Sequence, residues 1–347
     1  MMSKHKNFRS RAPLRLGLAG GGTDLSPYSD THGGAVLNIT IDRFAHASLR
    51  LTEKSEVKID VLDMGASATH PMGHLPTDGP FALAAGVYNH VVERYLAGRP
   101  FGAEIATTID APPGSGLGAS SALTVALLDS FRAAFELPLG EYDVAHGAFE
   151  IERVDLGLAG GKQDQYAASF GGVNFIEFLA DDRVIVNPLR ISDTILYDLQ
   201  SSIVICFSGQ SRASETVIRE QVSAMSRNDA QVIENLHKLK RDAHDMKLAL
   251  SRGDFSSLAR LLNESWKAKK ATASSVTNSH IDNLWSVAHN NGAFAGKVSG
   301  AGGGGFVMFL VDPDSRPRIF KALAEAGGVP GDVNLTKDGV VSWPTSI

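Results

Sequence analysis

The chain has few of the features that mark secreted or membrane-embedded proteins. Cys206 is the one cysteine among 347 residues, so no disulfide can form within the chain, and a reducing compartment fits this composition. No run of 18 apolar residues occurs, which excludes a transmembrane helix of ordinary length. The basic residues 1–11 are not followed by the apolar segment of a signal peptide. We therefore expect a cytoplasmic protein with no membrane partner.

A large charge of one sign is also absent. The chain carries 33 Lys and Arg against 38 Asp and Glu, a formal net charge of −5. Binding nucleic acid through bulk charge requires a positive excess, so no nucleic-acid partner is expected. Apolar residues make up 43% and charged residues 20% of the chain, an ordinary globular composition. The length favours two domains, which we place at residues 1–195 and 196–347.

The spacing of apolar residues predicts an α+β fold. Strands are expected where apolar residues alternate or form short runs, at residues 13–19, 35–41, 45–51, 57–62, 101–109, 173–178, 184–189, 202–207 and 305–311. Helices are expected where apolar residues recur at helical spacing, at residues 81–97, 123–131, 141–154, 163–170, 228–252, 254–266, 279–290 and 313–326. Cys206 lies in one of the apolar runs and is expected to be a buried thiol.

Glycine, by contrast, is abundant. The chain has 35 glycines, and they concentrate in three segments, residues 17–24, 112–122 and 297–306. The middle segment follows an expected strand and leads into an expected helix. A glycine-rich turn at the N-terminus of a helix offers free backbone N–H groups and a positive dipole end to a phosphate. The middle segment therefore predicts a phosphate-binding loop.

Other interpretations of these glycines remain open. The middle segment lacks the lysine of the nucleotide-binding P-loop. It fits the dinucleotide fingerprint loosely, but the region about 20 residues on, where that fingerprint has an acidic residue after a second strand, is still helical. A strand–helix turn without a ligand is a further alternative. The third segment precedes a strand, and its four consecutive glycines exceed what a turn needs, so we expect close approach to a ligand or to another loop.

Taken in order, the three glycine segments resemble the motifs of the GHMP kinase superfamily, which includes galactokinase, homoserine kinase, mevalonate kinase and phosphomevalonate kinase. The resemblance spans about residues 10–345. Residues 20–24, taken with 160–165 and 170–172, resemble the bacterial heptose phosphate kinases, which use ATP to phosphorylate the anomeric position of heptose 7-phosphate. The implied fold has an N-terminal domain like the second domain of ribosomal protein S5 and a ferredoxin-like C-terminal domain, with ATP and sugar in the cleft between them.

The resemblance implies an ATP site at the middle segment. The residues implied in binding the triphosphate are Pro113, Gly114, Ser115, Gly116, Leu117, Gly118, Ala119 and Ser120. Ser121 matches a serine that helps to hold Mg²⁺, a place that Ser120 takes if the register is shifted by one. Glu152 is implied as a second ligand of Mg²⁺. It lies twelve positions before Asp164, one more than is usual in the family, so Glu150 is the alternative.

The resemblance also implies residues at the sugar acceptor. Asp164 matches the catalytic aspartate, which would accept the proton of the sugar hydroxyl or orient that hydroxyl. Arg15, nine positions before Asp24, matches a basic residue that would keep Asp164 ionised and stabilise charge on the transferred phosphoryl group. Without the resemblance, Arg15 would be interpreted as an exposed charge on a strand, and Asp164 as an acidic residue in the first turn of a helix.

Substrate recognition is expected to involve the first and third glycine segments and two basic residues outside them. Gly22, Thr23 and Asp24 are expected at the sugar, where a carboxylate can accept hydrogen bonds from two adjacent hydroxyls. Lys162 and Arg43 are candidates for a phosphate already on the substrate, although either could be a surface charge. The residues of the third segment that are expected at the substrate are Gly302 and Gly303.

Three functions remain open on the sequence. The favoured one is a heptose 7-phosphate kinase, and the second is another small-molecule kinase of the superfamily, acting for instance on fucose or galactose. The third is a ligand-binding relative without activity. Asp164, Ser121 and Glu152 together argue against this last function, because a binding protein needs neither a base nor metal ligands. The small-molecule partners are then ATP and a sugar phosphate, and a homodimer is a further expectation.

Overall fold

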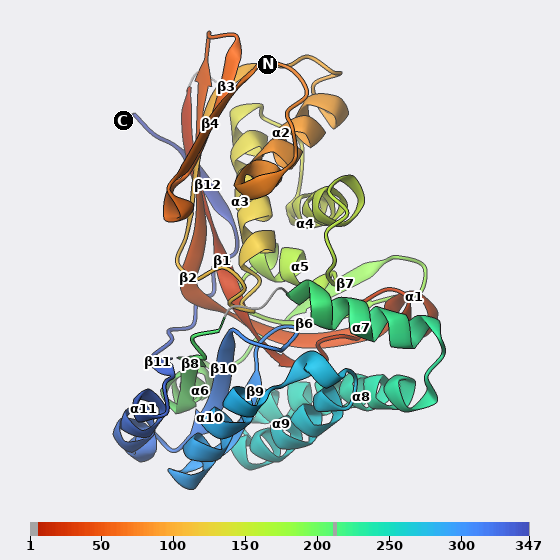
Figure 1. Ribbon diagram of the computed structural model, residues 1–347, viewed down its shortest axis with the longest axis vertical. Coiled ribbons are helices and arrows are strands. Elements are labelled where there is room, and N and C mark those ends of the chain that lie inside the picture. Colours follow the sequence, from red (N-terminus) through yellow and green to blue (C-terminus); the bar gives the residue numbers. More distant parts are fainter. Residues whose placement is uncertain (1–5, 211–213, 347) are drawn as a thin grey trace.

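The computed structural model describes residues 6–210 and 214–346. Two β-sheets organise the chain (Figure 1). The larger sheet has the strand order β12-β1-β2-β5-β3-β4, with β6 paired to β2 and β7 paired to β6. Its strands are β1 (Asn7–Ala19), β2 (Gly34–Thr52), β3 (Glu56–Val61), β4 (Ala66–Pro71), β5 (Gly102–Ile109), β6 (Val173–Phe178), β7 (Val184–Pro188) and β12 (Val341–Pro344).

The smaller sheet is antiparallel and has the order β11-β8-β10-β9. Its strands are β8 (Ile203–Phe207), β9 (Ala293–Val298), β10 (Phe306–Val311) and β11 (Val329–Gly331). Cys206 is buried in β8 as expected, and this burial raises the pKa of its thiol to about 12. A thiol with so high a pKa is a poor nucleophile, so Cys206 belongs to the core and not to a site.

Helices cover one face of the larger sheet and surround the smaller one (Figure 1). Those packed near the larger sheet are α1 (Tyr28–His32), α2 (Ala82–Arg94), α3 (Ala119–Ala134), α4 (Glu141–Glu150) and α5 (Gln163–Phe170). Those that follow are α6 (Asp193–Ser202), α7 (Ser214–Ser226), α8 (Ala230–Arg252), α9 (Phe255–Lys270), α10 (Ser279–Asn290) and α11 (Arg316–Glu325). In Figure 1, α7 lies between the two groups of helices.

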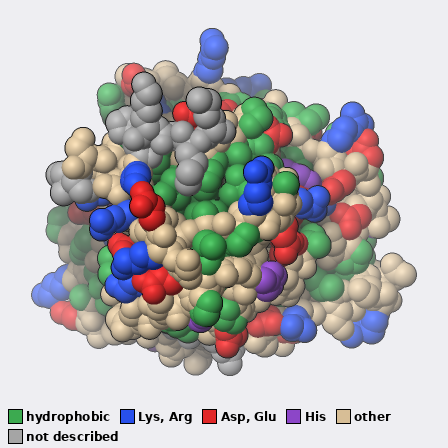
Figure 2. Space-filling view, turned by 90° about the horizontal axis from the view of Figure 1, so that it is seen from above, with side chains coloured by type: hydrophobic (Ala, Val, Ile, Leu, Met, Phe, Trp, Pro, Cys, Tyr) green, Lys and Arg blue, Asp and Glu red, His purple; other side chains and the backbone are tan. Residues whose placement is uncertain are grey.

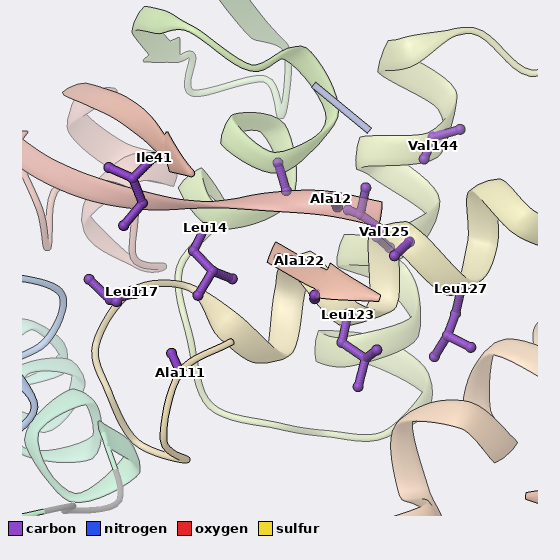
Figure 3. Close-up of a cluster of buried hydrophobic side chains, with 14 of the residues drawn as sticks. Ala12, Leu14, Ile41, Ala111, Leu117, Ala122, Leu123, Val125, Leu127 and Val144 are labelled. Carbon is purple, nitrogen blue, oxygen red and sulfur yellow. The ribbon is translucent and has the colours of Figure 1, made fainter. Parts of the chain in front are cut away.

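Helix α3 is the centre of the larger core. It contacts both β1 and β2. Val125 and Leu127 of α3 lie in one buried cluster with Leu14 of β1 and Ile41 of β2, and Val125 lies on the side of α3 that faces β1 (Figure 3). Leu117, from the glycine loop that precedes α3, is also fully buried in this cluster. The phosphate-loop candidate is therefore anchored to the core at its middle and is not a free surface loop.

Several expected elements have different bounds in the structure. The two strands expected at residues 35–41 and 45–51 are the single strand β2, which pairs with β1 along its length and absorbs an irregularity opposite Pro13 and Leu14. The helix expected at residues 141–154 is α-helical only to Glu150 and continues as a π-helical turn over Ile151–Asp155. The sequence pattern did not predict β4, β9, β11, β12, α1, α6 or α7.

The end of the chain returns to the larger sheet. Strand β12 pairs with β1, with Trp343 opposite Arg9, so residues 341–344 extend a sheet built mainly from the first half of the chain. Helix α6 crosses the boundary expected between residues 195 and 196. That boundary stays a prediction, but the larger sheet is not made from residues 1–195 alone.

The surface carries charges of both signs. On the face shown in Figure 2, the Lys and Arg side chains are interspersed with those of Asp and Glu, with apolar side chains between them. This agrees with the small formal net charge of −5. Within residues 6–210 and 214–346, no helix combines the length and the apolar character needed to cross a bilayer.

Candidate active site

A cleft of about 360 Å³ lies where the first two glycine segments meet the start of α5. Helices α7 and α9 contribute Gln221 and Lys269 to its wall, and the third glycine segment contributes Gly300 and Ala301. The cleft therefore brings together all three glycine segments, which lie far apart in the sequence.

The middle glycine segment forms the expected turn before α3. Gly114, Gly116 and Gly118 have φ angles of 69°, 75° and 74°, a region that residues with a side chain rarely adopt. Gly118 immediately precedes α3, so the free N–H groups of that helix open toward the cleft. The expected phosphate-binding residues that line the cleft are Gly114, Ser115, Gly116, Gly118, Ala119 and Ser120.

Two residues expected at the triphosphate are placed elsewhere. The Leu117 side chain points into the core, and its carbonyl accepts a hydrogen bond from the Arg15 N–H at 3.0 Å. Leu117 thus anchors the loop and does not offer its side chain to a ligand. Pro113 is exposed and lies outside the residues that line the cleft.

The third glycine segment packs against the middle one. Phe306 N–H donates to the Ser115 carbonyl at 2.9 Å. A Cβ at Gly305 would lie 2.4 Å from that carbonyl oxygen, and a Cβ at Gly300 would lie 2.7 Å from the Gly116 carbonyl oxygen. These distances are too short for a side chain. Of the two expected partners of this segment, a ligand or another loop, the structure shows the close approach to another loop.

Gly302 and Gly303, which were expected at the substrate, lie against η4 (Ser274–Val276) instead. Gly303 N–H donates to the Val276 carbonyl at 2.7 Å, and a Cβ at Gly302 would lie 2.5 Å from that oxygen. Because their backbones are committed to this contact, neither glycine lines the cleft.

Arg15 and Asp164, 149 positions apart, form a salt bridge at the centre of the cleft. Arg15 Nη2 lies 2.6 Å from Asp164 Oδ1, and Nε donates to the same oxygen at 2.7 Å. Arg15 Nη1 also donates to the Gly116 carbonyl at 2.7 Å. The Arg15 side chain is 5% exposed and that of Asp164 22%, so the carboxylate is the partner that faces the cleft.

The environment of Asp164 shifts the pKa of its carboxyl upward. Burial disfavours the charged form, and this outweighs the opposing effect of the Arg15 guanidinium; the nearby carboxylate of Asp24 also raises the pKa. Arg15 acts in the expected direction, because its charge and its hydrogen bond lower the pKa of Asp164, but the effect of burial is larger. A carboxylate with a raised pKa is a better proton acceptor than an ordinary aspartate.

Asp24 is buried beside Asp164 and is held by three N–H donors. Gly22 N–H donates to Oδ1 at 3.0 Å, and the backbone N–H and Nε2 of Gln163 donate to Oδ2 at 3.2 and 3.1 Å. Gly161 allows this approach, because a Cβ there would lie 1.9 Å from Asp24 Oδ2. Gly22 and Asp24 both line the cleft, as expected.

Thr23 does not present its hydroxyl to the cleft. Its single hydroxyl proton is shared between the carbonyls of Gly20 and Ala35, which lie 2.8 and 3.0 Å from Oγ1, and Oγ1 accepts from the Ala35 N–H at 3.1 Å. The side chain is fully buried. Thr23 thus fixes the glycine turn to β2, and its expected contact with the sugar is replaced by a structural one.

Glu152 lies against the start of α3. Its Oε1 accepts from Ser120 Oγ at 2.6 Å and its Oε2 from Gln165 Nε2 at 2.6 Å, while the same Nε2 donates to Ser121 Oγ at 3.1 Å. Glu150 instead faces Arg94 and His146 on the other side of α4. The structure therefore connects Glu152, and not Glu150, to Ser120 directly and to Ser121 through Gln165.

The π-helical turn explains the unusual spacing between Glu152 and Asp164. Leu156 N–H donates to the Ile151 carbonyl, five residues back, which is the π-helical pattern. Such a turn accommodates one additional residue compared with an α-helix. The twelve positions between Glu152 and Asp164 thus fit a glutamate that still points to the phosphate loop.

Two buried lysines add positive charge around the first glycine segment. Lys269 Nζ donates to the Gly21 carbonyl at 2.9 Å, and Lys297 Nζ donates to the Gly17 carbonyl at 2.8 Å. Burial lowers the pKa of Lys269 to about 8, although Asp24 opposes the shift. Burial and the charges of Lys269 and Arg15 lower the pKa of Lys297 to about 7. An anion in the cleft would favour the charged form of both lysines.

The two residues expected at a substrate phosphate differ in position. Lys162 lines a second cavity next to the cleft, but its Nζ is engaged by Asp182 Oδ1 at 2.5 Å and Asp30 Oδ1 at 3.4 Å. Arg43 lies outside both cavities and places its guanidinium 5.3 Å from the centre of the Phe306 ring. Arg43 is therefore corrected from a candidate for phosphate binding to a packing residue.

Comparison with known proteins agrees with this arrangement. Residues 82–172 match the family profile described as GHMP kinases N terminal domain, and residues 246–329 match GHMP kinases C terminal. A D-glycero-alpha-D-manno-heptose 7-phosphate kinase of Campylobacter jejuni is 42% identical over 97% of this chain and 99% of its own length. The chain belongs to the GHMP kinases.

Solved structures show the same fold. A crystal structure of a D-glycero-D-manno-heptose 1-phosphate kinase from Bacteroides thetaiotaomicron is 41% identical, has a TM-score of 0.83, and covers 98% of this chain and 100% of its own. Lactococcus lactis galactokinase complexed with galactose is 20% identical, with a TM-score of 0.75 and coverage of 98% and 95%. The GHMP kinase described here therefore has the two-domain α+β fold of its family.

The polar residues of this GHMP kinase site that were not predicted include Gln163, Gln165, Lys269 and Arg153. Gln163 and Gln165 lie on either side of Asp164, and their place in a polar segment after two glycines was the signal available. Lys269 is the penultimate residue of α9, three positions after Trp266 and seven after Leu262. This helical spacing places the lysine on the buried face of α9, and that was the signal available. Only the fold brings it to the first glycine segment.

Proposed function

We propose that this GHMP kinase transfers the terminal phosphoryl group of ATP to the anomeric hydroxyl of D-glycero-D-manno-heptose 7-phosphate. The product is the 1,7-bisphosphate, on the route to GDP-heptose. The observation that carries the proposal is the Arg15–Asp164 pair, with 2.6 Å between Nη2 and Oδ1, placed between the phosphate loop and Asp24. The likeness to a heptose 7-phosphate kinase supports the choice of sugar.

Asp164 is the proposed proton acceptor. The sugar hydroxyl attacks the terminal phosphorus of ATP, the bond from that phosphorus to ADP breaks, and the hydroxyl proton passes to the Asp164 carboxylate. The raised pKa of Asp164 makes this transfer easier than it would be for an exposed aspartate. Arg15 would stabilise charge on the transferred group while holding the carboxylate in place.

The residues near the start of α3 fit a magnesium ion. Mg²⁺ prefers oxygen ligands and is often held by one or two carboxylates together with substrate phosphates. Glu152 supplies a fully buried carboxylate, and Ser121 a hydroxyl close by. Among the described residues, no group of three His, Cys, Asp or Glu side chains could hold a metal, so phosphate oxygens of ATP would have to supply further ligands. When bound, the ion would neutralise phosphate charge.

Product analysis tests the proposal. The relatives carry names that differ in which phosphate is already present, heptose 7-phosphate in one and heptose 1-phosphate in the other. Purified enzyme with Mg·ATP is therefore offered heptose 7-phosphate, heptose 1-phosphate, galactose and fucose separately, and products are identified by phosphorus NMR. We expect a new anomeric phosphate on heptose 7-phosphate. Faster turnover of any other acceptor would overturn the assignment.

The remaining expectations from the sequence accompany this proposal. A cytoplasmic location, a homodimer, and the lack of nucleic-acid and membrane partners stay predictions. Light scattering coupled to gel filtration would measure the mass against the monomer mass of 36.8 kDa. A single species at twice that mass would support the homodimer.

A further inference from the structure

A second cavity of about 510 Å³ adjoins the cleft. The two share a wall that includes Asp24, Leu25, Arg153 and Ile218. The second cavity extends beyond Asp24, away from the phosphate loop, and its outer wall includes Lys162 and residues of α7 such as Arg219. A substrate that starts at Asp164 and passes Asp24 would reach into this cavity.

The walls of the second cavity carry more positive than negative charge. Arg153, Lys162 and Arg219 line it together with the carboxylate of Asp24. The negative charge of Asp24 is already stabilised by three N–H donors. Lys162 is paired with Asp182 and Asp30, and Arg219 with Glu215 on the preceding turn of α7. These two cations are thus largely balanced.

Within the described part of the chain, Arg153 has no carboxylate within hydrogen-bond distance, although its charge also acts on the carboxyl of Asp164. Its Nε donates to the Gly161 carbonyl at 3.3 Å, and its Nη1 donates to the Leu158 carbonyl at 3.4 Å. The nearest carboxylate oxygen, Glu152 Oε1, lies 3.8 Å from Nη1, and that oxygen also accepts from Ser120. The Arg153 side chain is only 14% exposed. A guanidinium so withdrawn from water favours an anion that can accept two of its N–H groups.

We propose that the second cavity binds the phosphate that the acceptor already carries, with Arg153 as its main ligand and Arg219 on the opposite wall. This rests on the proposed function, because it takes the acceptor to be a sugar phosphate. The reacting hydroxyl then lies at Asp164, the sugar passes Asp24, and the phosphate reaches Arg153. Lys162, already held by two carboxylates, has a secondary part.

The arrangement explains how the site would select its acceptor. Arg153 lines both cavities, so a phosphate bound there fixes the distance between the far end of the sugar and Asp164. A shorter sugar, or one without a terminal phosphate, leaves the guanidinium without its anion. Such a loss of a charged hydrogen bond weakens binding by about tenfold to a hundredfold.

The test compares heptose 7-phosphate with unphosphorylated heptose as acceptors. The measured quantity is the ratio of their kcat/KM values, with the KM for ATP measured in parallel. We expect Arg153→Met to lower this ratio by about tenfold to a hundredfold, Arg153→Lys to recover part of it, and Arg219→Ala to lower it severalfold. The KM for ATP should stay within about twofold of the wild-type value.

Arg241→Ala is the matched control for Arg219→Ala. Arg241 is also an exposed arginine paired with a glutamate of its own helix, Glu234, but it lines neither cavity. An unchanged acceptor ratio in both Arg153→Met and Arg219→Ala would overturn the proposal, as would a rise in the KM for ATP that matches the rise for the sugar. Wild-type turnover of heptose 7-phosphate tests the proposed function separately, so the two failures are distinguishable.

Discussion

The two ends of the cleft are built from different materials. At the proposed nucleotide end, backbone atoms of glycine segments define the surface, and two loops approach so closely that a Cβ at Gly305 would lie 2.4 Å from the Ser115 oxygen. At the acceptor end, charged side chains from distant segments hold one another, as Arg15 and Asp164 do at 2.6 Å. The surface of one end depends on glycines, which have no side chain, and the surface of the other depends on charged side chains.

This difference indicates which part of the cleft can change its specificity for the acceptor. A phosphate loop that uses backbone N–H groups binds any nucleotide triphosphate in much the same way, and its geometry leaves little freedom for substitution. The acceptor end depends on a few charged side chains around Asp24 and Arg153. Substitution there can alter the acceptor without disturbing the phosphate loop.

The largest effect is expected where the two ends meet. Asp164→Asn keeps the shape of the side chain and removes its ability to accept a proton. We expect kcat to fall by roughly 10²–10⁴, the range for loss of a general base, with little change in ATP affinity. Single-turnover transfer with saturating sugar and Mg·ATP measures this. A rate within about twofold of wild type would remove Asp164 from the chemistry and leave positioning as the source of catalysis.

Adding one methyl group at Gly116 should disturb the nucleotide end and leave the acceptor end intact. Gly116 has φ 75°, and a Cβ there would lie 2.4 Å from the Ser299 carbonyl oxygen. Gly116→Ala must therefore strain the loop and separate it from the third glycine segment. This should lower the free energy of unfolding by about 2 to 3 kcal/mol. We expect weaker ATP binding and a lower free energy of unfolding.

Gly65→Ala is the control for Gly116→Ala. Gly65 also has a positive φ, 61°, but no atom lies within 4 Å of the position of its Cβ. It should share the backbone strain and leave ATP binding unchanged. Isothermal titration with a non-hydrolysable ATP analogue measures the affinity. Equal affinities in the two variants would contradict the idea that loop contact shapes the nucleotide end.

Charge, and not shape, should govern the effect of Lys269 at the other end. Its folded-state pKa of about 8 lies below the ordinary value of 10.5, so between these pH values the unfolded chain binds more protons than the folded one. Stability then rises with pH through this window. At pH 7 the buried charge destabilises the fold by about 3 kcal/mol, which the hydrogen bond to Gly21 offsets by about 1 kcal/mol.

Lys269→Met should therefore raise the free energy of unfolding at pH 7 by about 2 kcal/mol. The difference from wild type should shrink as the pH rises from 8 toward 10, because the native lysine then loses its proton. Urea unfolding of both proteins across this range measures the effect. A variant that is less stable at pH 7, by an amount independent of pH, would show that Lys269 contributes through packing.

The sequence predicted the nucleotide end better than the acceptor end, because one is built from glycine backbone and the other from charged side chains of distant segments. Glycines that need a positive φ leave a visible pattern, which is why Gly114, Gly116 and Gly118 were found. The pattern did not separate Leu117 from its glycine neighbours. A leucine between glycines could have been interpreted as a residue that anchors the loop to the core. The pairing of Arg15 with Asp164 came from the resemblance and not from the 149 positions between them.

At the acceptor end, neighbours in sequence point in different directions. Thr23 and Asp24 are adjacent in the sequence. The Thr23 hydroxyl hydrogen-bonds to the backbone of β2, whereas the Asp24 side chain lines the cleft. No periodicity predicts this in a turn. Arg153 was overlooked because a charged residue on a helix is usually exposed, and the π-helical turn that buries its side chain has no clear sequence signal.

A moderate effect should distinguish two glutamates at the nucleotide end. Glu152→Gln keeps the hydrogen-bond acceptor for Ser120 but removes the charge that would attract Mg²⁺. We expect the Mg²⁺ concentration for half-maximal activity to rise by about tenfold, the scale of one charged interaction. Glu150→Gln, on the opposite side of α4, should leave it unchanged. The reverse result would identify Glu150 as the ligand.

The smallest effect is expected for Arg43→Ala, which sharpens the comparison because Arg43 is a charge that neither cavity contains. Its guanidinium lies 5.3 Å from the Phe306 ring centre, and losing this contact should lower the free energy of unfolding by about 0.5 to 1 kcal/mol. The KM for heptose 7-phosphate should stay within about twofold of wild type. Chemical unfolding and steady-state kinetics on one preparation measure both. A rise in KM confined to the phosphorylated sugar would move the phosphate site from Arg153 to Arg43, and the second cavity would then lose its proposed ligand.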